Sequence, residues 1–351
     1  MDLGGEGMKV RIGIIGCGSI TKFRHGPEYK NNILAEIVGF YDPVKERAEE
    51  MVKLFGGRLY ESYKELIDDA DIEAVSVCTS NESHKEITIE AICKGKHVLC
   101  EKPMTIDADD AQAMVDTALK YKKILMLDHN QRLSPAHKRV KEIIENGELG
   151  RVLSFRTTFG HKGPEYWGAE RSKNTWFFNK TKSGLGVIGD LGVHKIDLMR
   201  FLLDDEFETV LAIGGALHKT NEAGELIQVP DNIICMLKTK KGVIGSGTFS
   251  WTFYGKEDNS TIVYCEQGII RIYDDANYSI KIEKLNGEEV FYKLEGMQTN
   301  DNQTSTGVID AFINSIVNKQ PPLISGEDGV RSMIVLQGIM RSLKTGVTIK
   351  L

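Results

Sequence analysis

The stretch KVRIGIIGCGSIT, residues 9–21, decides how the first part of this chain folds. Its first seven residues are mostly apolar and β-branched, which is typical of a strand covered on both faces. Gly16 and Gly18 follow at once and permit a tight turn, after which we expect a helix to begin. Such a turn brings backbone N–H groups close to a pyrophosphate at the helix N-terminus. We therefore assign Gly16, Gly18, Ser19 and Ile20 to cofactor binding.

Asp42 closes the next strand-like run, at roughly the distance where an acid hydrogen-bonds the adenosine ribose of a dinucleotide. A carboxylate there would repel a 2′-phosphate, so the sequence predicts NAD rather than NADP. Two alternatives remain open. Asp42 and Pro43 could serve only to cap the following helix, and Lys45 or Arg47 could support a 2′-phosphate.

Outward from this stretch, the first third of the chain alternates continuous apolar runs with segments of helical period. Apolar runs without alternation indicate parallel strands buried between helices. We predict a doubly wound α/β Rossmann domain over residues 1–130 that binds NAD. Its strands are expected at Lys9–Ile15, Ile33–Tyr41, Ile72–Cys78, His97–Cys100 and Ile124–Leu127, and its helices at Pro43–Phe55, Ser83–Lys94 and Asp107–Lys120.

Beyond residue 130 the pattern changes to longer strands separated by short turns, which favours a large, mainly antiparallel open sheet. We predict an α+β domain over residues 131–351 for substrate binding and oligomerisation. The expected strands are Val152–Phe159, Glu208–Ala216, Asn232–Thr239, Val243–Trp251, Thr261–Cys265, Ile269–Tyr273 and Ile280–Lys284. A helix at Pro135–Glu145 leads in, and helices at Gly189–Leu203, Gly307–Val317 and Glu327–Leu343 are expected to cover one face of the sheet.

The composition excludes several classes of protein. Of 351 residues, 41% are hydrophobic and the formal net charge is −6, so we expect neither nucleic acid nor an anionic membrane as a partner. No apolar stretch reaches the roughly 18 residues of a membrane span, and no secretory signal is expected. The six cysteines are scattered without a CxxC pair, which favours a reducing compartment and a cytoplasmic location.

Polar segments follow the predicted parallel strands, at the edge where an open α/β sheet binds its ligand. These segments are 79–84, 101–103 and 130–132. Capping of the next helix is the alternative role of His84, to which we give no catalytic part. The expected cofactor contacts are Thr79, Ser80, Asn81, His84, Glu101, Lys102 and Asn130.

Two of these edge residues are also candidates for contact with the substrate. Pro103 fixes the backbone and holds Lys102 extended, so that the ammonium lies where a substrate oxygen would meet a nicotinamide. A solvated turn is the alternative for this EKP tripeptide. Arg132 faces the same crevice by position, and an ion pair between the domains is its alternative role.

A second group of reactive side chains lies in GLGVIGDLGVHKID, residues 184–197. Asp190, His194 and Asp197 stand at i, i+4 and i+7, so an α-helix would present all three on one face. An acid and an imidazole one turn apart are suited to moving a proton. The alternative is a capping aspartate beside a buried core histidine.

Together, the glycine turn, the acid after the second strand, the TSN segment, EKP and DxGxHxxD resemble the Gfo/Idh/MocA family of sugar and polyol oxidoreductases. The resemblance covers essentially the whole chain. Three positions depart from the usual pattern: Thr21 replaces a glycine or alanine, Ser80 a proline, and Leu185 a glycine. The third glycine or alanine of the usual pattern lets the helix pack closely against the strand. With threonine at this position, we expect slightly looser packing between the two.

The resemblance implies a mechanism. His194 would remove the hydroxyl proton as hydride passes to nicotinamide, Lys102 would stabilise charge on the same oxygen, and Asp190 would orient the substrate or support His194. No metal is needed. The loop HKGPEYW, residues 161–167, would help to shape a sugar pocket. The expected substrate contacts are Lys102, Arg132, Tyr166, Trp176, Asp190 and His194.

The predicted function is therefore NAD-dependent hydride transfer between nicotinamide and a secondary hydroxyl or ketone of a cyclitol, sugar or sugar derivative. Two alternatives use the same family fold: a glycosidase that retains NAD, and a non-catalytic regulator that senses NAD. An exposed sheet face in the second domain would need cover, and the resemblance favours a homodimer or homotetramer.

Overall fold

The computed structural model describes residues 9–295 and 305–351. The described residues form two compact units, which we treat separately. The first contains residues 9–105, 109–128 and 305–330, and the second contains 106–108, 129–295 and 331–351. Residues 305–330 thus belong to the first unit, whereas the sequence placed them in the second.

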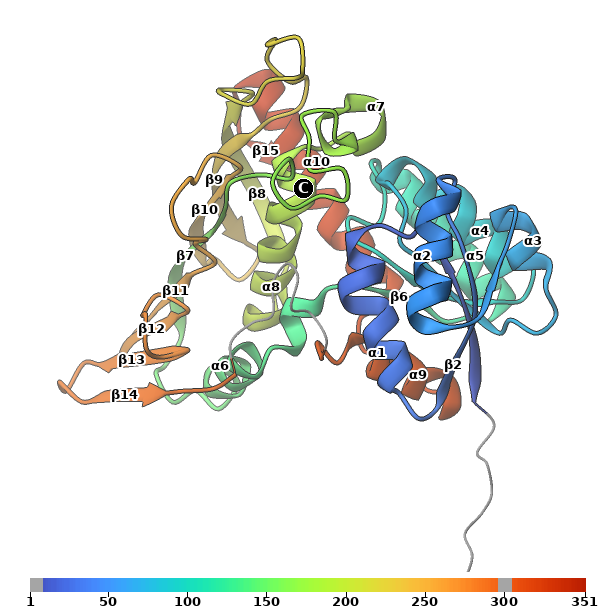
Figure 1. The fold of residues 1–351 in the computed structure, drawn as a ribbon. Helices are drawn as coiled ribbons and strands as arrows, with labels where there is room; N and C mark the ends of the chain where they lie inside the picture. Colours follow the sequence, from blue (N-terminus) through green and yellow to red (C-terminus); the bar gives the residue numbers. More distant parts are fainter. Residues whose placement is uncertain (1–8, 296–304) are drawn as a thin grey trace, which may run out of the picture. The chain divides into compact units, whose positions relative to one another are not determined.

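The first unit is built on a six-stranded parallel sheet in the order β3-β2-β1-β4-β5-β6, which confirms the predicted doubly wound fold (Figure 1). The short pair of residues in β3 carries too little pattern to be predicted. The strands are β1 (Val10–Ile15), β2 (Ala35–Tyr41), β3 (Arg58–Leu59), β4 (Ala74–Val77), β5 (His97–Cys100) and β6 (Leu125–Leu127).

Helices enclose this sheet, as the continuous apolar strands require. Helices α1, α2 and α9 lie together on one side, and α3 and α4 contact each other (Figure 1). The bounds are α1 (Gly26–Asn31), α2 (Lys45–Phe55), α3 (Tyr63–Asp68), α4 (His84–Cys93), α5 (Ala108–Tyr121) and α9 (Val308–Val317).

The predicted place of α9 over the second sheet is wrong, because this helix packs against β1 and α1 in the first unit. Polar contacts fasten it there. Asn32 Nδ2 donates to Asp310 Oδ1 at 2.6 Å, and Glu28 accepts hydrogen bonds from the amide and hydroxyl of Thr306 at 2.7 Å. An apolar helix pattern does not reveal which of two sheets the helix will cover.

The second unit contains a nine-stranded sheet in the order β14-β13-β12-β11-β7-β10-β9-β8-β15 (Figure 1). It is mostly antiparallel, as predicted, but β7 and β10 are parallel neighbours. The strands β14 and β15 were not predicted. The bounds are β7 (Val152–Gly160), β8 (Phe207–Gly215), β9 (Asn232–Thr239), β10 (Ile244–Ser250), β11 (Thr261–Cys265), β12 (Gly268–Ile272), β13 (Ile280–Lys284), β14 (Glu289–Tyr292) and β15 (Ile349–Lys350).

Helices cover one face of this second sheet. α6 contacts both α8 and β12, and α8 contacts β7. The predicted helix at 189–203 begins as a π-turn, η5, before it becomes α8. The bounds are α6 (Pro135–Glu145), α7 (Lys180–Ser183), η5 (Ile188–Gly192), α8 (Val193–Leu203) and α10 (Gly326–Thr345). None of the described helices is long and apolar enough to span a membrane.

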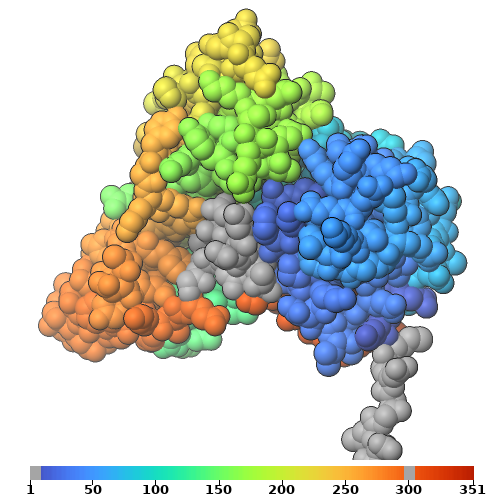
Figure 2. Space-filling view, in the orientation of Figure 1, coloured from blue at the N-terminus to red at the C-terminus, as the bar shows by residue number. Residues whose placement is uncertain are grey.

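The opposite face of the second sheet carries apolar side chains without cover in the described residues. Along β9 buried and exposed residues alternate, so that Ile234 and Met236 are 60% and 59% exposed. Ile213 on β8 pairs directly with Ile234 and is 78% exposed. Ile244 on β10 extends the patch. Figure 2 shows the region of β12 to β14, in orange, at one edge of the second unit. Antiparallel sheets commonly leave one face for solvent or a partner.

Lys195 is a basic residue whose side chain is fully buried in the core of the second unit. Its Nζ donates to the carbonyl of Asn259 at 2.7 Å and the hydroxyl of Thr261 at 3.3 Å. Both acceptors are neutral. Burial is the main cause that lowers the pKa of Lys195 to about 7, although Asp258 and Glu257 oppose the shift.

We expect the lysine to make stability depend on pH. Between pH about 7 and 10.5 the unfolded chain binds a proton that folded Lys195 has lost, so the free energy of unfolding should rise with pH across this window, by up to about 1 kcal/mol per pH unit. Lys195→Met should remove that slope. Urea denaturation at several pH values measures it, with the exposed Lys138→Met as control; parallel curves for wild type and Lys195→Met would contradict the assignment.

Candidate functional site

The glycine turn after β1 has two different requirements for glycine. Gly16 adopts φ +95°, and a Cβ there would lie 2.5 Å from the carbonyl oxygen of Cys78, so the fold itself needs glycine. A Cβ on Gly18 would meet nothing within 4 Å. Glycine at that position leaves open space beside the turn, and Ser19 and Ile20, which follow it, are partly exposed. This arrangement fits the close approach of a pyrophosphate.

Thr21 is better packed than the sequence predicted. Its side chain is fully buried and its hydroxyl donates to the Gly16 carbonyl at 2.6 Å. It opens the π-turn η1 (Thr21–His25), which precedes α1. The expectation of looser packing is therefore wrong, because the hydroxyl closes the glycine turn with a hydrogen bond that alanine or glycine would lack.

Asp42 joins the glycine turn to the start of α2. Its Oδ2 accepts the backbone N–H of Cys17 at 2.7 Å, and its Oδ1 accepts that of Val44 at 2.8 Å. The contact with Val44 agrees with a role for Asp42 at the start of α2, and the contact with Cys17 places its carboxylate against the glycine turn. Lys45, the alternative aid to a 2′-phosphate, instead pairs with Glu61 at 3.1 Å.

His84 lies between two of the edge segments. The ring is fully buried, and its nitrogens lie 3.0 Å from the Pro103 carbonyl oxygen and 3.1 Å from that of Thr79. Burial lowers the pKa of His84, so the neutral ring is favoured. A ring so enclosed ties the two segments together and leaves no surface for the cofactor contact that we predicted.

The rest of the 79–84 segment is a short turn at the end of β4. Thr79 accepts a hydrogen bond from the Ser83 hydroxyl at 2.7 Å, and Asn81 begins the 3-10 turn η2 (Asn81–Ser83). Ser80 is partly exposed and Asn81 is buried. Asn130 opens a similar turn, η3 (Asn130–Leu133), and is partly exposed in the second unit.

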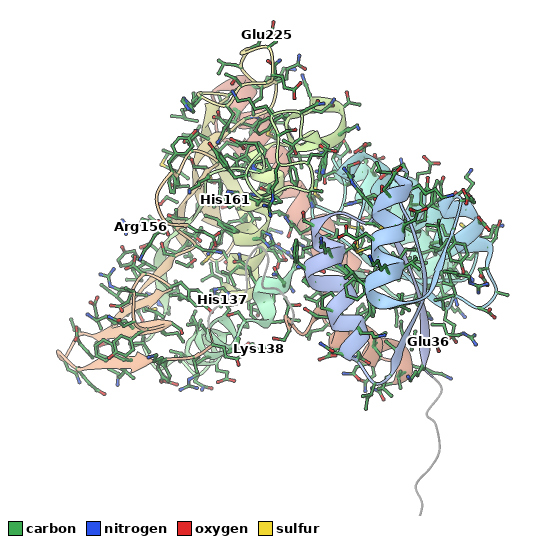
Figure 3. The ribbon with its side chains drawn as sticks, in the orientation of Figure 1. Glu36, His137, Lys138, Arg156, His161 and Glu225 are labelled. Atoms are coloured by element: carbon green, nitrogen blue, oxygen red, sulfur yellow. The ribbon has the colours of Figure 1, made fainter. Side chains whose placement is uncertain are left out.

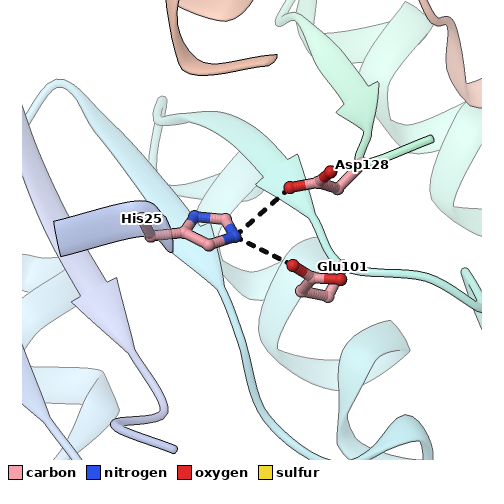
Figure 4. A group of neighbouring side chains, drawn as sticks. All are labelled: His25, Glu101 and Asp128. Atoms are coloured by element: carbon pink, nitrogen blue, oxygen red, sulfur yellow. Dashed lines mark hydrogen bonds and ion pairs between the residues drawn. The ribbon is translucent and has the colours of Figure 1, made fainter. Parts of the chain in front are cut away.

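The EKP segment separates its two charged side chains. Lys102 precedes a cis peptide bond to Pro103 and is partly exposed. Glu101 turns inward: it is buried, and its Oε1 lies 2.9 Å from His25 Nε2 and also accepts from Arg24 (Figure 4). The predicted cofactor contact of Glu101 is replaced by these buried ones.

His25, Glu101 and Asp128 bring three metal-ligating atoms within 4.8 Å of one another (Figure 4). These residues do not fit a metal ion, because Arg24 Nη2 already donates to both carboxylates, at 2.7 Å in the case of Asp128 Oδ2. The guanidinium holds the position where a metal cation would be needed. Sequence reasoning missed this group because its members are far apart along the chain.

The reactive groups of the second unit lie at the start of α8. Asp190, in η5, accepts the indole N–H of Trp251 at Oδ2, at 2.9 Å, and both side chains are buried. His194 is buried with its ring 5.8 Å from that of Phe159. Because η5 is a π-turn, the 3.6-residue spacing assumed for Asp190 and His194 does not apply there.

Asp197 and Arg132 form a separate structural pair. Arg132 Nε and Nη2 donate to the two carboxylate oxygens of Asp197 at 2.7 and 2.6 Å, and both residues are buried within the second unit. This bidentate pair engages Nε and Nη2 of Arg132 within one unit. The substrate contact expected of Arg132 and its alternative role in an ion pair between the domains stay predictions.

Aromatic rings line the region that follows β7. His161, labelled in Figure 3, directly follows β7. Its ring packs edge-on against that of Trp167, with 5.8 Å between the centroids. Trp176 stacks on Phe177 with 3.9 Å between ring centroids, and Phe177 contacts Trp167 in turn. Trp176 also lines a hollow of about 720 Å³ within the second unit, together with Phe178, Asn179, Lys182 and Ile227.

Tyr166 is placed differently from Trp176. It is 57% exposed, with Lys219 Nζ 5.4 Å from its ring, and it does not line that hollow. Of the residues that sequence reasoning missed, Trp251 has the clearest role, since it holds Asp190. A tryptophan at the end of an apolar strand carried no signal that its N–H would meet a carboxylate.

Two family models match the chain. The model of the oxidoreductase family with an NAD-binding Rossmann fold matches residues 10–129, and the GFO/IDH/MocA C-terminal domain matches residues 137–271. The folds of solved structures agree: levoglucosan dehydrogenase in complex with NADH and levoglucosan superimposes with a TM-score of 0.85 at 23% identity, covering 98% of this chain and 99% of that one.

Relatives in sequence include glucose-6-phosphate 3-dehydrogenase of Bacillus subtilis, 37% identical over 220 residues, which are 62% of this chain and 61% of that enzyme. The chain therefore spans less than two thirds of this relative's length in the match. Myo-inositol 2-dehydrogenase of Thermotoga maritima is 26% identical over 345 residues, which are 97% of this chain and 98% of that enzyme. With both of its domains matched, the chain belongs to the GFO/IDH/MocA family of oxidoreductases, whose Rossmann domain binds NAD.

Proposed function

We propose that the chain catalyses reversible, NAD-linked oxidation of a secondary hydroxyl on a cyclitol, sugar or sugar derivative. The observation that carries the proposal is the buried pair of proton-handling side chains at the start of α8, Asp190 and His194, in a chain of an NAD-binding oxidoreductase family. The relatives add the substrate class, since their names specify ring positions of a hexose phosphate and an inositol.

The proposed roles follow from the chemistry of each side chain. His194 acts as general base for the substrate hydroxyl, because an imidazole changes charge near neutral pH. Asp190, fixed by the Trp251 indole, orients the substrate or supports His194. Lys102 presents a cation to the reacting oxygen and stabilises charge that develops there. NAD, when bound, supplies the hydride acceptor.

The cofactor residues that we propose follow the ends of the parallel strands, and all of them except Asn130 belong to the first unit. Gly18 leaves the space, Ser19 and Ile20 begin the helix that receives the pyrophosphate, and Asp42 lies against the turn for the ribose hydroxyls. Thr79, Ser80, Asn81, Lys102 and Asn130 remain in this set, whereas His84 and Glu101 become residues that position the others.

For the substrate end we propose Lys102, Asp190 and His194, with the aromatic face of Trp176 as a contact for the apolar face of a sugar ring. We assign cofactor binding to the Rossmann unit and substrate binding to the second unit. Tyr166 stays in the proposed set as an exposed aromatic of the same loop. A cytoplasmic location fits the six free cysteines, four of which are buried.

Reduced nicotinamide absorbance, followed with NAD and NADP separately against inositols, sugars, sugar phosphates and sugar acids, tests the function. We expect NAD-linked turnover with one substrate class and a loss of about 10²–10⁴-fold in kcat for Lys102→Ala and for His194→Ala. Lys138→Ala, at an exposed lysine of α6, serves as control. Measurable NAD binding without turnover across the panel would instead favour the NAD-retaining glycosidase or the regulator.

The two glycines of the turn provide a matched pair of variants. Gly16→Ala should lower the melting temperature, because its Cβ would strike the Cys78 carbonyl and its φ is positive. Gly18→Ala should fold as wild type and raise the Kd for NAD, because its Cβ fills only the space left for the cofactor. Thermal unfolding and titration calorimetry measure the two effects. Normal NAD affinity in Gly18→Ala would argue against the pyrophosphate site.

We further propose that the open face of the second sheet is covered by another copy of the chain, giving a homodimer or homotetramer. Its exposed apolar residues Ile213, Ile234, Met236 and Ile244 come from three neighbouring strands, with exposed Lys238 paired beside Ile244, and an isologous interface would cover them. Charged side chains in the middle of such a face should prevent association, because an interface cannot bury unpaired charges.

Sedimentation velocity of a variant with Ile234→Lys and Met236→Lys should therefore show a monomer where the wild type sediments as a dimer or tetramer. The matched control is Leu119→Lys, an equally exposed apolar side chain on the first unit, which should leave the assembly unchanged. An assembled Ile234→Lys/Met236→Lys protein, or a monomeric wild type, would refute the proposed interface.

A further inference from the structure

Four ionisable side chains lie buried together at the carboxyl edge of the parallel sheet, next to Lys102 in the chain. Arg24 and His25 come from η1, Glu101 follows β5, and Asp128 follows β6 (Figure 4). Each is buried, and His25 and Asp128 are fully so. We call these four residues the Arg24 network. It joins three segments of the first unit that lie far apart in the sequence.

The charges of the Arg24 network compensate one another. Burial alone would raise the pKa of Glu101, but Arg24, His25 and Lys102 bring it well below its usual value, so Glu101 is ionised. Burial alone would lower the pKa of His25, but Cys78, Asp128 and Glu101 raise it well above its usual value, so His25 is a cation. Two basic and two acidic side chains thus face one another in a buried space.

The network also fixes the orientation of its members. His25 contacts Glu101 through Nε2 and the Ser76 hydroxyl, at 3.3 Å, through Nδ1. That hydroxyl is also bonded to Tyr29 at 2.7 Å, so the imidazole is held on both sides. A buried pair of charges adds little net stability, and its best attested use is to select one geometry over others. The question is which geometry this network selects.

Its contacts point to the EKP turn. One carboxylate oxygen of Glu101 faces Arg24 and His25, and the other accepts the backbone N–H of Lys102 at 3.2 Å. The backbone N–H of Asp128 donates to the Cys100 carbonyl at 3.0 Å, directly before Glu101. On the far side of the turn His84 binds the Pro103 carbonyl. Lys102 is therefore partly exposed, whereas the residues on either side of it, Glu101 and Pro103, form hydrogen bonds with buried side chains.

The same network reaches the cofactor turn. Arg24 and His25 belong to the helix that begins directly after Gly18, and Thr21 in that helix closes the turn by its bond to Gly16. Movement of η1 relative to β5 would shift the pyrophosphate site and Lys102 relative to each other. Oppositely charged groups that bridge η1, β5 and β6 oppose this movement.

We propose that Arg24, His25, Glu101 and Asp128 are positioning residues, which hold the Lys102 turn in register with the helix that receives the pyrophosphate. The proposal rests on the assignment of Lys102 to the reacting end under the proposed function. It predicts that loss of one charge within the network displaces Lys102 and loosens the cofactor turn, even though none of the four residues touches the substrate.

Glu101→Gln is the first variant to test, because it keeps the size of the side chain and removes its charge. We expect kcat to fall about 10–100-fold with little change in the sugar KM, since a misplaced lysine affects the transition state more than binding. The Kd for NAD, measured by calorimetry, should rise about 3–10-fold. Asp128→Asn should act in the same direction and provides the test if Glu101→Gln does not fold.

Lys96→Met is the matched control. Lys96 is a buried charge at the opposite end of β5, where Nζ donates to the carbonyls of Asp69 and Ile72 at 2.7 and 2.6 Å. Its loss should lower the melting temperature but leave kcat and NAD affinity unchanged. If Lys96→Met reduces kcat as much as Glu101→Gln does at equal loss of melting temperature, the effect is one of stability and the proposal is overturned.

Two further measurements separate this proposal from the proposed function. In a double-mutant cycle, Glu101→Gln with His25→Gln should be no worse than the poorer single variant, because the residues act as one unit. Labelling of Lys102 by an amine-reactive reagent, followed by peptide mass spectrometry, needs no substrate. A changed rate of Lys102 labelling in Glu101→Gln supports the positioning role. If the wild type at the same time turns over no sugar, the proposed function is refuted while the positioning role stands. Unchanged labelling and unchanged kcat in the folded variant refute the positioning role.

Discussion

A charge removed from water needs an opposite charge and hydrogen bonds beside it, or it costs several kcal/mol. This constraint organises the edge of the parallel sheet. Arg24 can be buried only because Glu101 and Asp128 meet it there, and these two carboxylates can be buried only because Arg24 and His25 accompany them. The ends of β5 and β6 and the start of the first helix are therefore placed by one another's charges, and the glycine turn and the EKP turn follow from where those ends lie.

The second unit also buries acidic side chains, Asp190 and Asp197, close together in the sequence. Asp190 is buried, and its Oδ2 accepts the indole N–H of Trp251. Asp197, only two helical turns away, is fully engaged by Arg132. Two aspartates of one helical segment thus have different partners: an indole N–H for Asp190 and a guanidinium for Asp197.

Much of the fold could be predicted because its signals are local. Continuous apolar strands, the turn at Gly16 and the alternation along β9 each report burial through neighbouring residues, and the family, the fold class and the NAD cofactor are confirmed. What failed depended on distant partners. The apolar pattern of α9 was right but its sheet was not, and the parallel pairing of β7 with β10 joins strands far apart in sequence.

The same difference between local and distant signals applies to the candidate site. Polar residues at strand ends were found because the topology places them there, but the sequence does not show which way their side chains point. Glu101 and Lys102 are adjacent, yet one turns inward to Arg24 while the other remains partly exposed. Nothing in the sequence indicated that Arg132 would donate from Nε and Nη2 to Asp197. Thr21 was predicted to loosen the packing, because the sequence does not show that its hydroxyl donates to the carbonyl of Gly16.

Both glycine-rich segments continue into a helix through a π-turn, η1 in one unit and η5 in the other. A π-turn holds one residue more than the α-turn it replaces, so each segment contains a residue that regular helix geometry would omit. Deleting Leu191 or Gly192 would shorten the spacing between Asp190 and His194 by one residue and would rotate the two side chains by about 100° relative to each other around the helix axis. The number of residues in these turns is thus as much a part of the site as their identity, and we expect relatives that share this chemistry to align here without gaps.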